Sequence, residues 1–178
     1  MWAKYSKKSG FTIVELLIVI VVIAVLAAIT VVAHNGIQTR SKTTKVNTDI
    51  ANLVKAIQSA RISVDGPLLG ITGTGCSGCS FPYTVTDTTP YNTLPKTHAC
   101  WVRYYSKLDA IAAAAGANLN SLKAGDPWGN PYWIDENEAE GGGCGLGRDS
   151  IRSVGSSGYV AGATFVGQVT VPYYTPGC

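Results

Sequence analysis

The sequence contains few of the residues from which catalytic sites are usually built. Its 178 residues include two histidines, and charged residues make up 14% of it, against roughly 25% in average soluble proteins. It has no Gly-x-Ser-x-Gly segment and no phosphate-binding P-loop, so no nucleophile with its base can be assembled from it. We therefore predict that the protein is not an enzyme.

A long apolar run lies near the N-terminus. Residues 11–33 (FTIVELLIVIVVIAVLAAITVVA) contain a single charge, that of Glu15. As an α-helix rising about 1.5 Å per residue, the run is about 34 Å long and can cross a hydrocarbon core of about 30 Å. The alternative is a buried core helix, but the glycine-rich remainder could hardly surround a helix that is apolar on every face. We predict a membrane span.

Glu15 is an unusual residue in such a span. A carboxylate inside an apolar membrane helix costs about 2.5–3.5 kcal/mol even on lenient insertion scales. No other residue of the run can neutralise it. We therefore expect its partner to come from another chain or from a newly made terminus.

The residues around Glu15 resemble a known processing signal. Residues 7–10 (KKSG) followed by residues 11–20 (FTIVELLIVI) are similar to the class III signal of type IV pilins and type II secretion pseudopilins. The resemblance implies that a prepilin peptidase cuts between Gly10 and Phe11 and that the amine of Phe11 is methylated. It also implies that Glu15 pairs with the Phe11 amine of a neighbouring subunit.

The same resemblance implies a fold and a set of partners. We expect an α+β pilin fold, in which one long helix packs on a small antiparallel sheet. The chain would divide into a leader (1–10), a transmembrane and filament-core helix (11–33), an amphipathic stalk helix (34–64) and a globular head (65–178). Its partners would be membrane lipid before assembly, the prepilin peptidase, other pilin subunits in a filament, and an assembly platform with its ATPase. The N-terminus would be cytoplasmic and the head extracytoplasmic, on a cell-surface filament.

The net charge of +3 carries no strong nucleic-acid signal. Three lysines, Lys4, Lys7 and Lys8, lie in the predicted leader. Their removal leaves equal numbers of basic and acidic side chains, so the mature chain would be neutral. A chain without net positive charge has little general attraction for phosphates.

The segment after the apolar run has the pattern of an amphipathic helix. Val46, Ile50, Leu53 and Ile57 recur at three- and four-residue spacings, and a sheet should pack on that stripe. Gly36 costs roughly 1 kcal/mol inside a helix, so we expect a bend or local melting at Asn35 and Gly36. Residues 65–67 (DGP) should end the helix.

The first half of the head is predicted to contain a loop, a strand and a helix. Residues 68–95 are rich in Gly, Thr, Ser and Pro and predict a long irregular loop. Residues 99–105 predict a strand with Trp101, Arg103 and Tyr105 on one face, a pattern that could stack nucleobases but more simply describes a packed strand. Residues 106–117 predict a short helix capped by Ser106 and ended at Gly116 or at residues 118–120.

The second half contains a further point of resemblance. Residues 126–132 (DPWGNPY) predict a turn that feeds a strand at residues 132–134, and this segment is similar to the one that leads into the sheet of major pseudopilins. Residues 159–174 predict one or two more strands, with Pro172 indicating a sheet edge.

An acidic loop follows the predicted strand. Its oxygen-rich side chains suit Ca²⁺, and major pseudopilins bind calcium near this point with help from a Ser-x-Gly-x-Asp-Gly segment. Residues 153–158 match that segment except that Ser157 replaces the aspartate, which favours a solvated acidic loop without a cofactor. The calcium candidates are Asp135, Glu136, Glu138, Glu140 and Asp149.

Five cysteines lie beyond the apolar run, and in an exported head most should be oxidised. We favour Cys144 with Cys178, and Cys76 or Cys79 with Cys100, which leaves one cysteine free. A zinc site made by His98 with Cys76, Cys79 and Cys100, or a redox-active pair in the Cys-x-x-Cys segment, is a weaker alternative.

We therefore predict a structural subunit of a type IV pilus-like filament that serves adhesion, motility or DNA uptake. One alternative is a pseudopilin of a type II secretion system, which residues 126–132 support. Another is a membrane-anchored surface adhesin or receptor that never polymerises.

Overall fold

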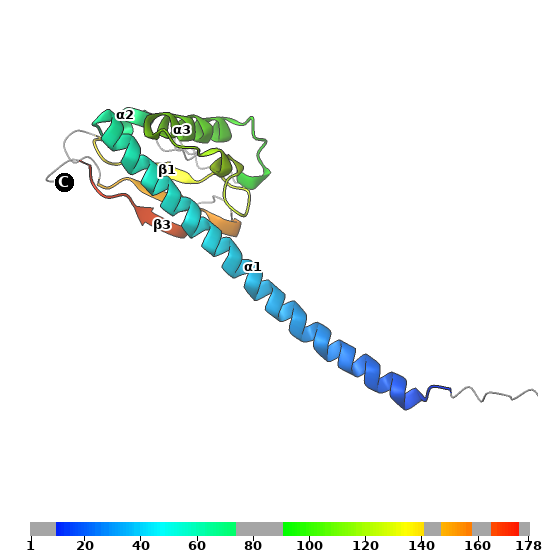
Figure 1. Cartoon of the computed structure of the whole chain (residues 1–178). Helices are drawn as coiled ribbons and strands as arrows, with labels where there is room; N and C mark the ends of the chain where they lie inside the picture. Colours follow the sequence, from blue (N-terminus) through cyan, green and yellow to red (C-terminus); the bar gives the residue numbers. More distant parts are fainter. Residues whose placement is uncertain (1–9, 74–90, 141–146, 158–164, 175–178) are drawn as a thin grey trace, which may run out of the picture. The chain divides into compact units, whose positions relative to one another are not determined.

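The protein has an α+β architecture, as predicted (Figure 1). The computed structural model describes residues 10–73, 91–140, 147–157 and 165–174, without the side chains of residues 31–35 and 157. The chain forms two compact units, residues 1–41 and residues 42–178. In chain order the elements are α1 (Ile13–Val64), α2 (Leu68–Thr72), the 3₁₀ turn η1 (Tyr91–Thr93), α3 (Ala99–Ala115), η2 (Asn120–Ala124), β1 (Trp133–Asp135), β2 (Ser150–Ser153), η3 (Gly155–Ser157) and β3 (Val166–Thr170).

The first unit contains the apolar part of α1. Residues Ile13–Thr30 are long and apolar enough to cross a membrane, and none of their side chains is buried. The helix continues through Asn35 and Gly36 without interruption, so the local melting expected there is not observed. One glycine costs only about 1 kcal/mol, which a helix of 52 residues can absorb.

In the second unit, the remainder of α1 contributes the predicted apolar stripe to the core. Val46, Ile50, Leu53 and Ile57 are each at most 1% exposed. Burial of an aliphatic side chain of this size contributes about 1.5–3 kcal/mol. The helix ends at Val64, as predicted, because Asp65 adopts a left-handed conformation with φ of 53° before Gly66 and Pro67.

The strand predicted at residues 99–105 is wrong, and so is the helix start at Ser106. A single helix, α3, covers both segments; the His98 side chain caps it by accepting a hydrogen bond from the Cys100 N–H, and Gly116 ends it with φ of 61°. Its buried positions follow a three- to four-residue period through the whole segment, so the short alternation around Trp101 was misleading. Arg103 is exposed whereas Trp101 is buried, so the two do not share a stacking face.

The sheet has three antiparallel strands in the order β1-β2-β3. Ile151 of β2 pairs with Ile134 of β1 and with Val169 of β3. The predicted strands at residues 132–134 and within 159–174 correspond to β1 and β3, and β3 lies at the sheet edge that Pro172 indicated. The central strand β2 was not predicted, since its four residues are too few to show a period.

The core lies where α1, α3 and the sheet meet, and α2 contacts α3 beside it. Figure 1 shows the second half of α1 running along the sheet. At Gly167 the β3 backbone approaches α1 so closely that a Cβ atom would lie 2.9 Å from a Val46 methyl group. Because Gly167 also has φ of 70°, only glycine fits this contact without strain. The irregular loop predicted at residues 68–95 is wrong at both ends, where α2 and η1 form; positions 74–90 are outside the described residues.

Candidate functional site

The N-terminal end of α1 is closed by a reciprocal capping box. Glu15 Oε2 accepts hydrogen bonds from the Thr12 backbone N–H at 2.7 Å and from the Thr12 hydroxyl at 2.8 Å. The Glu15 backbone N–H donates in return to Thr12 Oγ1 at 3.2 Å. This arrangement satisfies backbone donors that the first turn of a helix otherwise leaves unpaired. It also holds the Glu15 carboxylate toward the helix N-terminus.

These hydrogen bonds do not neutralise the charge of Glu15. Both bonds from Thr12 come from uncharged groups. Among the described residues, no lysine or arginine forms an ion pair with Glu15. The partner of Glu15 from another chain or a new terminus therefore stays a prediction.

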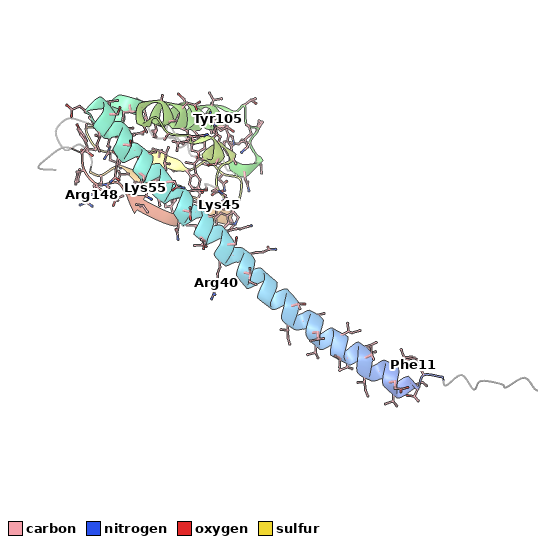
Figure 2. All side chains as sticks on the ribbon, viewed as in Figure 1. Phe11, Arg40, Lys45, Lys55, Tyr105 and Arg148 are labelled. Carbon is pink, nitrogen blue, oxygen red and sulfur yellow. The ribbon has the colours of Figure 1, made fainter. Side chains whose placement is uncertain are left out.

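Phe11 lies immediately before this cap, at the N-terminal end of α1 (Figure 2). Its side chain is 84% exposed. The large apolar side chains that follow it, from Ile13 to Ile29, are at least half exposed around the whole helix. Such a surface requires lipid or other helices as its surroundings. The leader residues 1–9 are outside the described residues, so the cut between Gly10 and Phe11 stays a prediction.

In the second unit, the predicted turn at residues 126–132 is built around the Asp126 carboxylate. Oδ1 accepts hydrogen bonds from the backbone N–H groups of Trp128 at 3.0 Å and Asn130 at 2.9 Å. Oδ2 accepts one from the hydroxyl of Ser153, in β2, at 2.7 Å. Asn130 in turn donates to the Gly155 carbonyl at 2.9 Å. Through these bonds the side chains of Asp126 and Asn130 attach the turn to the sheet.

The loop between β1 and β2 is not the solvated acidic loop that the sequence favoured. Glu136, Glu138 and Asp149 are each fully buried. Arg61 of α1 forms ion pairs with both Glu138 and Asp149. Lys107 of α3 forms an ion pair with Glu136.

Two further contacts complete this arrangement. Thr72 donates its hydroxyl to Glu136 at 2.7 Å. Asp135 is paired with Arg152 at 2.6 Å on the partly exposed face of the sheet. Glu140 is half-buried, and no ion pair of Glu140 is seen among the described residues.

Burial affects the titration of two of these acids. It raises the pKa of Glu136, and the opposing effects of the Lys107 charge and its hydrogen bond are smaller. Burial likewise raises the pKa of Asp149, against a backbone hydrogen bond from Glu138 and the charge of Arg61. Desolvation therefore outweighs ion pairing at both carboxylates.

The carboxylates in this loop do not fit a calcium ion. Calcium takes six to eight oxygen ligands that converge on one point. Four of the five candidate acids instead face three different cations, and the described residues contain no group of three or more His, Cys, Asp or Glu that could hold a metal.

Cys100 is the one cysteine among the described residues. Cys100 is disulfide-bonded. The candidates Cys76, Cys79, Cys144 and Cys178 all lie outside the described residues, so the predicted pairings stay predictions. In the alternative zinc site, His98 would be a ligand; here its side chain caps α3.

The sequence interpretation missed three residues at these sites, and two of them had a readable signal. Thr12 and Glu15 form the Thr-x-x-Glu pattern of a capping box. Arg61 falls four residues after Ile57, in line with the buried stripe of α1, and that spacing was a readable sign of burial. Lys107 had no usable signal, because its helix was not recognised through residues 99–105.

One comparison with known proteins gives a match. Residues 5–31 match a family described as the prokaryotic N-terminal methylation motif. The match includes the predicted cleavage point, Thr12, Glu15 and most of the apolar run. Neither a curated protein nor a solved structure matches the chain.

Proposed function

We propose that this chain is a structural subunit of a type IV pilus-like filament and polymerises through its N-terminal helix. The observation that carries the proposal is a capped Glu15 at the start of an exposed apolar helix, inside a segment that matches the N-terminal methylation motif. A motif of this kind indicates a structural subunit rather than an enzyme.

Processing would create the partner that Glu15 lacks. A prepilin peptidase on the cytoplasmic side would cut after Gly10, and the new amine of Phe11 would be methylated. Cleavage would thus create one new positive charge, on Phe11, four residues before Glu15. Pairing it with Glu15 of a neighbouring copy would remove much of the cost, about 2.5–3.5 kcal/mol, of a lone carboxylate in the span.

The apolar helices would then form the filament core. In lipid, helices gain little from the hydrophobic effect and associate by van der Waals packing and specific polar contacts. The uniformly exposed side chains of Ile13–Thr30 offer such a packing surface, and the Glu15–Phe11 contact would fix the register. An assembly platform and an ATPase inside the cell would supply the work, while the head faces outward.

Two other functions are supported by particular features. A pseudopilin of a type II secretion system is favoured by the turn at residues 126–132, whose Asp126 contacts attach it to the sheet. In that case deletion of the chain would abolish protein secretion rather than surface filaments. A membrane-anchored adhesin or receptor would use the same apolar helix but would not need Glu15.

Substitution of Glu15 separates polymerisation from anchoring. We expect Glu15→Ala to abolish sheared surface filaments while the amount of protein in the membrane stays normal. Glu15→Gln keeps the shape and hydrogen-bonding oxygen of the side chain but not its charge, so it should fail in the same way. Unchanged surface display and function of both variants would support the non-polymerising receptor.

A further inference from the structure

We infer that the buried side chains of Arg61 and Lys107 take the place of a bound divalent ion in the head. They hold the loop between β1 and β2 as such an ion would, so the head folds without calcium. The inference concerns residues 42–178 alone and does not depend on whether the chain polymerises. The buried carboxylates of the acidic loop are paired with the protein's own cations, Arg61 and Lys107.

Arg61 lies among three segments of the chain. Its guanidinium belongs to the last turn of α1 and contacts Asp149, lies 3.3 Å from Glu138, and donates through Nη1 to the Pro172 carbonyl at 2.7 Å. The side chain is 2% exposed. One cation therefore joins α1, the loop before β2 and the segment after β3, as a metal ion with ligands from several segments would.

The two carboxylates beside Arg61 already accept hydrogen bonds from backbone N–H groups of the protein. Asp149 Oδ1 accepts the Glu138 backbone N–H at 2.8 Å. Glu138 accepts the Tyr174 backbone N–H at 3.0 Å and 3.1 Å through its two oxygens. A calcium ion here would have to displace the guanidinium, which holds the remaining coordination positions of both carboxylates.

Lys107 is the second buried cation of this loop. Lys107 of α3 carries its ammonium group to Glu136, and both side chains are at most 3% exposed. The same Glu136 oxygen accepts the Thr72 hydroxyl from α2. Two helices and the residue that follows β1 thus meet at one buried pair. A buried carboxylate that lost its cation would be strongly destabilising.

The arrangement predicts what removal of Arg61 would expose. Glu138 and Asp149 would remain as two neighbouring buried carboxylates without a cation. A surface cleft of about 270 Å³, lined by Arg61 and by residues such as Gln58 and Pro172, would give an ion access to them. Hard oxygen ligands of this kind bind calcium.

The test is thermal unfolding of the full-length protein in detergent, with chelator or with millimolar calcium chloride. We expect the wild-type midpoint to be the same in both. Arg61→Ala should lower the midpoint in chelator by roughly 6–20 °C, the range expected when one partner of a buried ion pair is removed from a domain of this size. Calcium should then raise the midpoint of this variant by several degrees through preferential binding to the folded state.

Three control variants make the test specific. Arg152→Ala breaks the partly exposed pair with Asp135 and should show no calcium response. Lys107→Met exposes only one carboxylate and should be destabilised without a calcium response. Adding Asp149→Asn to Arg61→Ala should abolish the response, because one carboxylate of the pair is then neutral.

The outcomes decide the inference in either direction. A wild-type midpoint that falls in chelator or rises with calcium overturns it. Absence of a calcium response in Arg61→Ala also overturns it, because the guanidinium would then not stand in the place of a metal ion. If Arg61→Ala can be recovered folded only with calcium present, the inference is supported; recovery in neither condition contradicts it.

Discussion

Replacing Asp126 by alanine should destabilise the head more than any other change in the turn at residues 126–132. The side chain is 4% exposed, and its three shortest hydrogen bonds come from two backbone N–H groups and one hydroxyl. Hydrogen bonds to a charged group contribute roughly 1.5–3 kcal/mol each, and non-additivity makes 3–5 kcal/mol a reasonable total for the three. For a domain of this size the unfolding midpoint should fall by roughly 6–20 °C.

The assay is thermal unfolding followed by circular dichroism, with Asp126→Asn as the matched control. Asparagine keeps one oxygen that can accept from Trp128 and Asn130, so we expect it to lose about half as much stability. Ser153→Ala removes only the bond to the sheet and should cost about 1–2 kcal/mol. A loss below about 1 kcal/mol for Asp126→Ala would refute the idea that this carboxylate attaches the turn to the sheet.

Two further predictions concern the cap of α1 and the buried acid beside Lys107. Thr12→Val removes the capping hydroxyl, which contributes about 0.5–2 kcal/mol, and should reduce filament yield about fivefold if 1 kcal/mol is lost per subunit. The control Thr12→Ser should behave as wild type. An undiminished filament yield in Thr12→Val would show that the cap does not orient Glu15. Because burial raises the pKa of Glu136 above its ordinary value of 4.5, the native state holds this proton more tightly than the unfolded state does. The contribution of Glu136 to stability should therefore increase as the pH falls from the raised pKa toward 4.5, and be lost as the pH rises through the raised pKa. Unfolding midpoints of the wild type relative to Glu136→Gln across this range measure the effect, and a relative midpoint that falls on acidification would contradict it.

The long helix and its packing stripe could be predicted because they depend on local patterns. The apolar run, the spacing from Val46 to Ile57 and the stop at Asp65 are all readable within a few residues of chain. The turn at residues 126–132 was readable for the same reason, since Pro127 and Gly129 restrict the backbone directly.

The failures have a common physical origin in contacts between distant segments. The strand β2 is stabilised by pairing on both sides, which its four residues do not reveal. The acids of the loop looked solvated because their cations, Arg61 and Lys107, come from helices far away in the sequence. A helix was mistaken for a strand at residues 99–105 because a short stretch of aromatic residues fits both periods.

Processing at Phe11 would create the charge that Glu15 needs for polymerisation. The most direct measurement is mass spectrometry of the N-terminal peptide of chains recovered from sheared surface filaments. We predict that every assembled chain begins at a methylated Phe11. Filaments built from chains that still carry residues 1–10 would contradict the account.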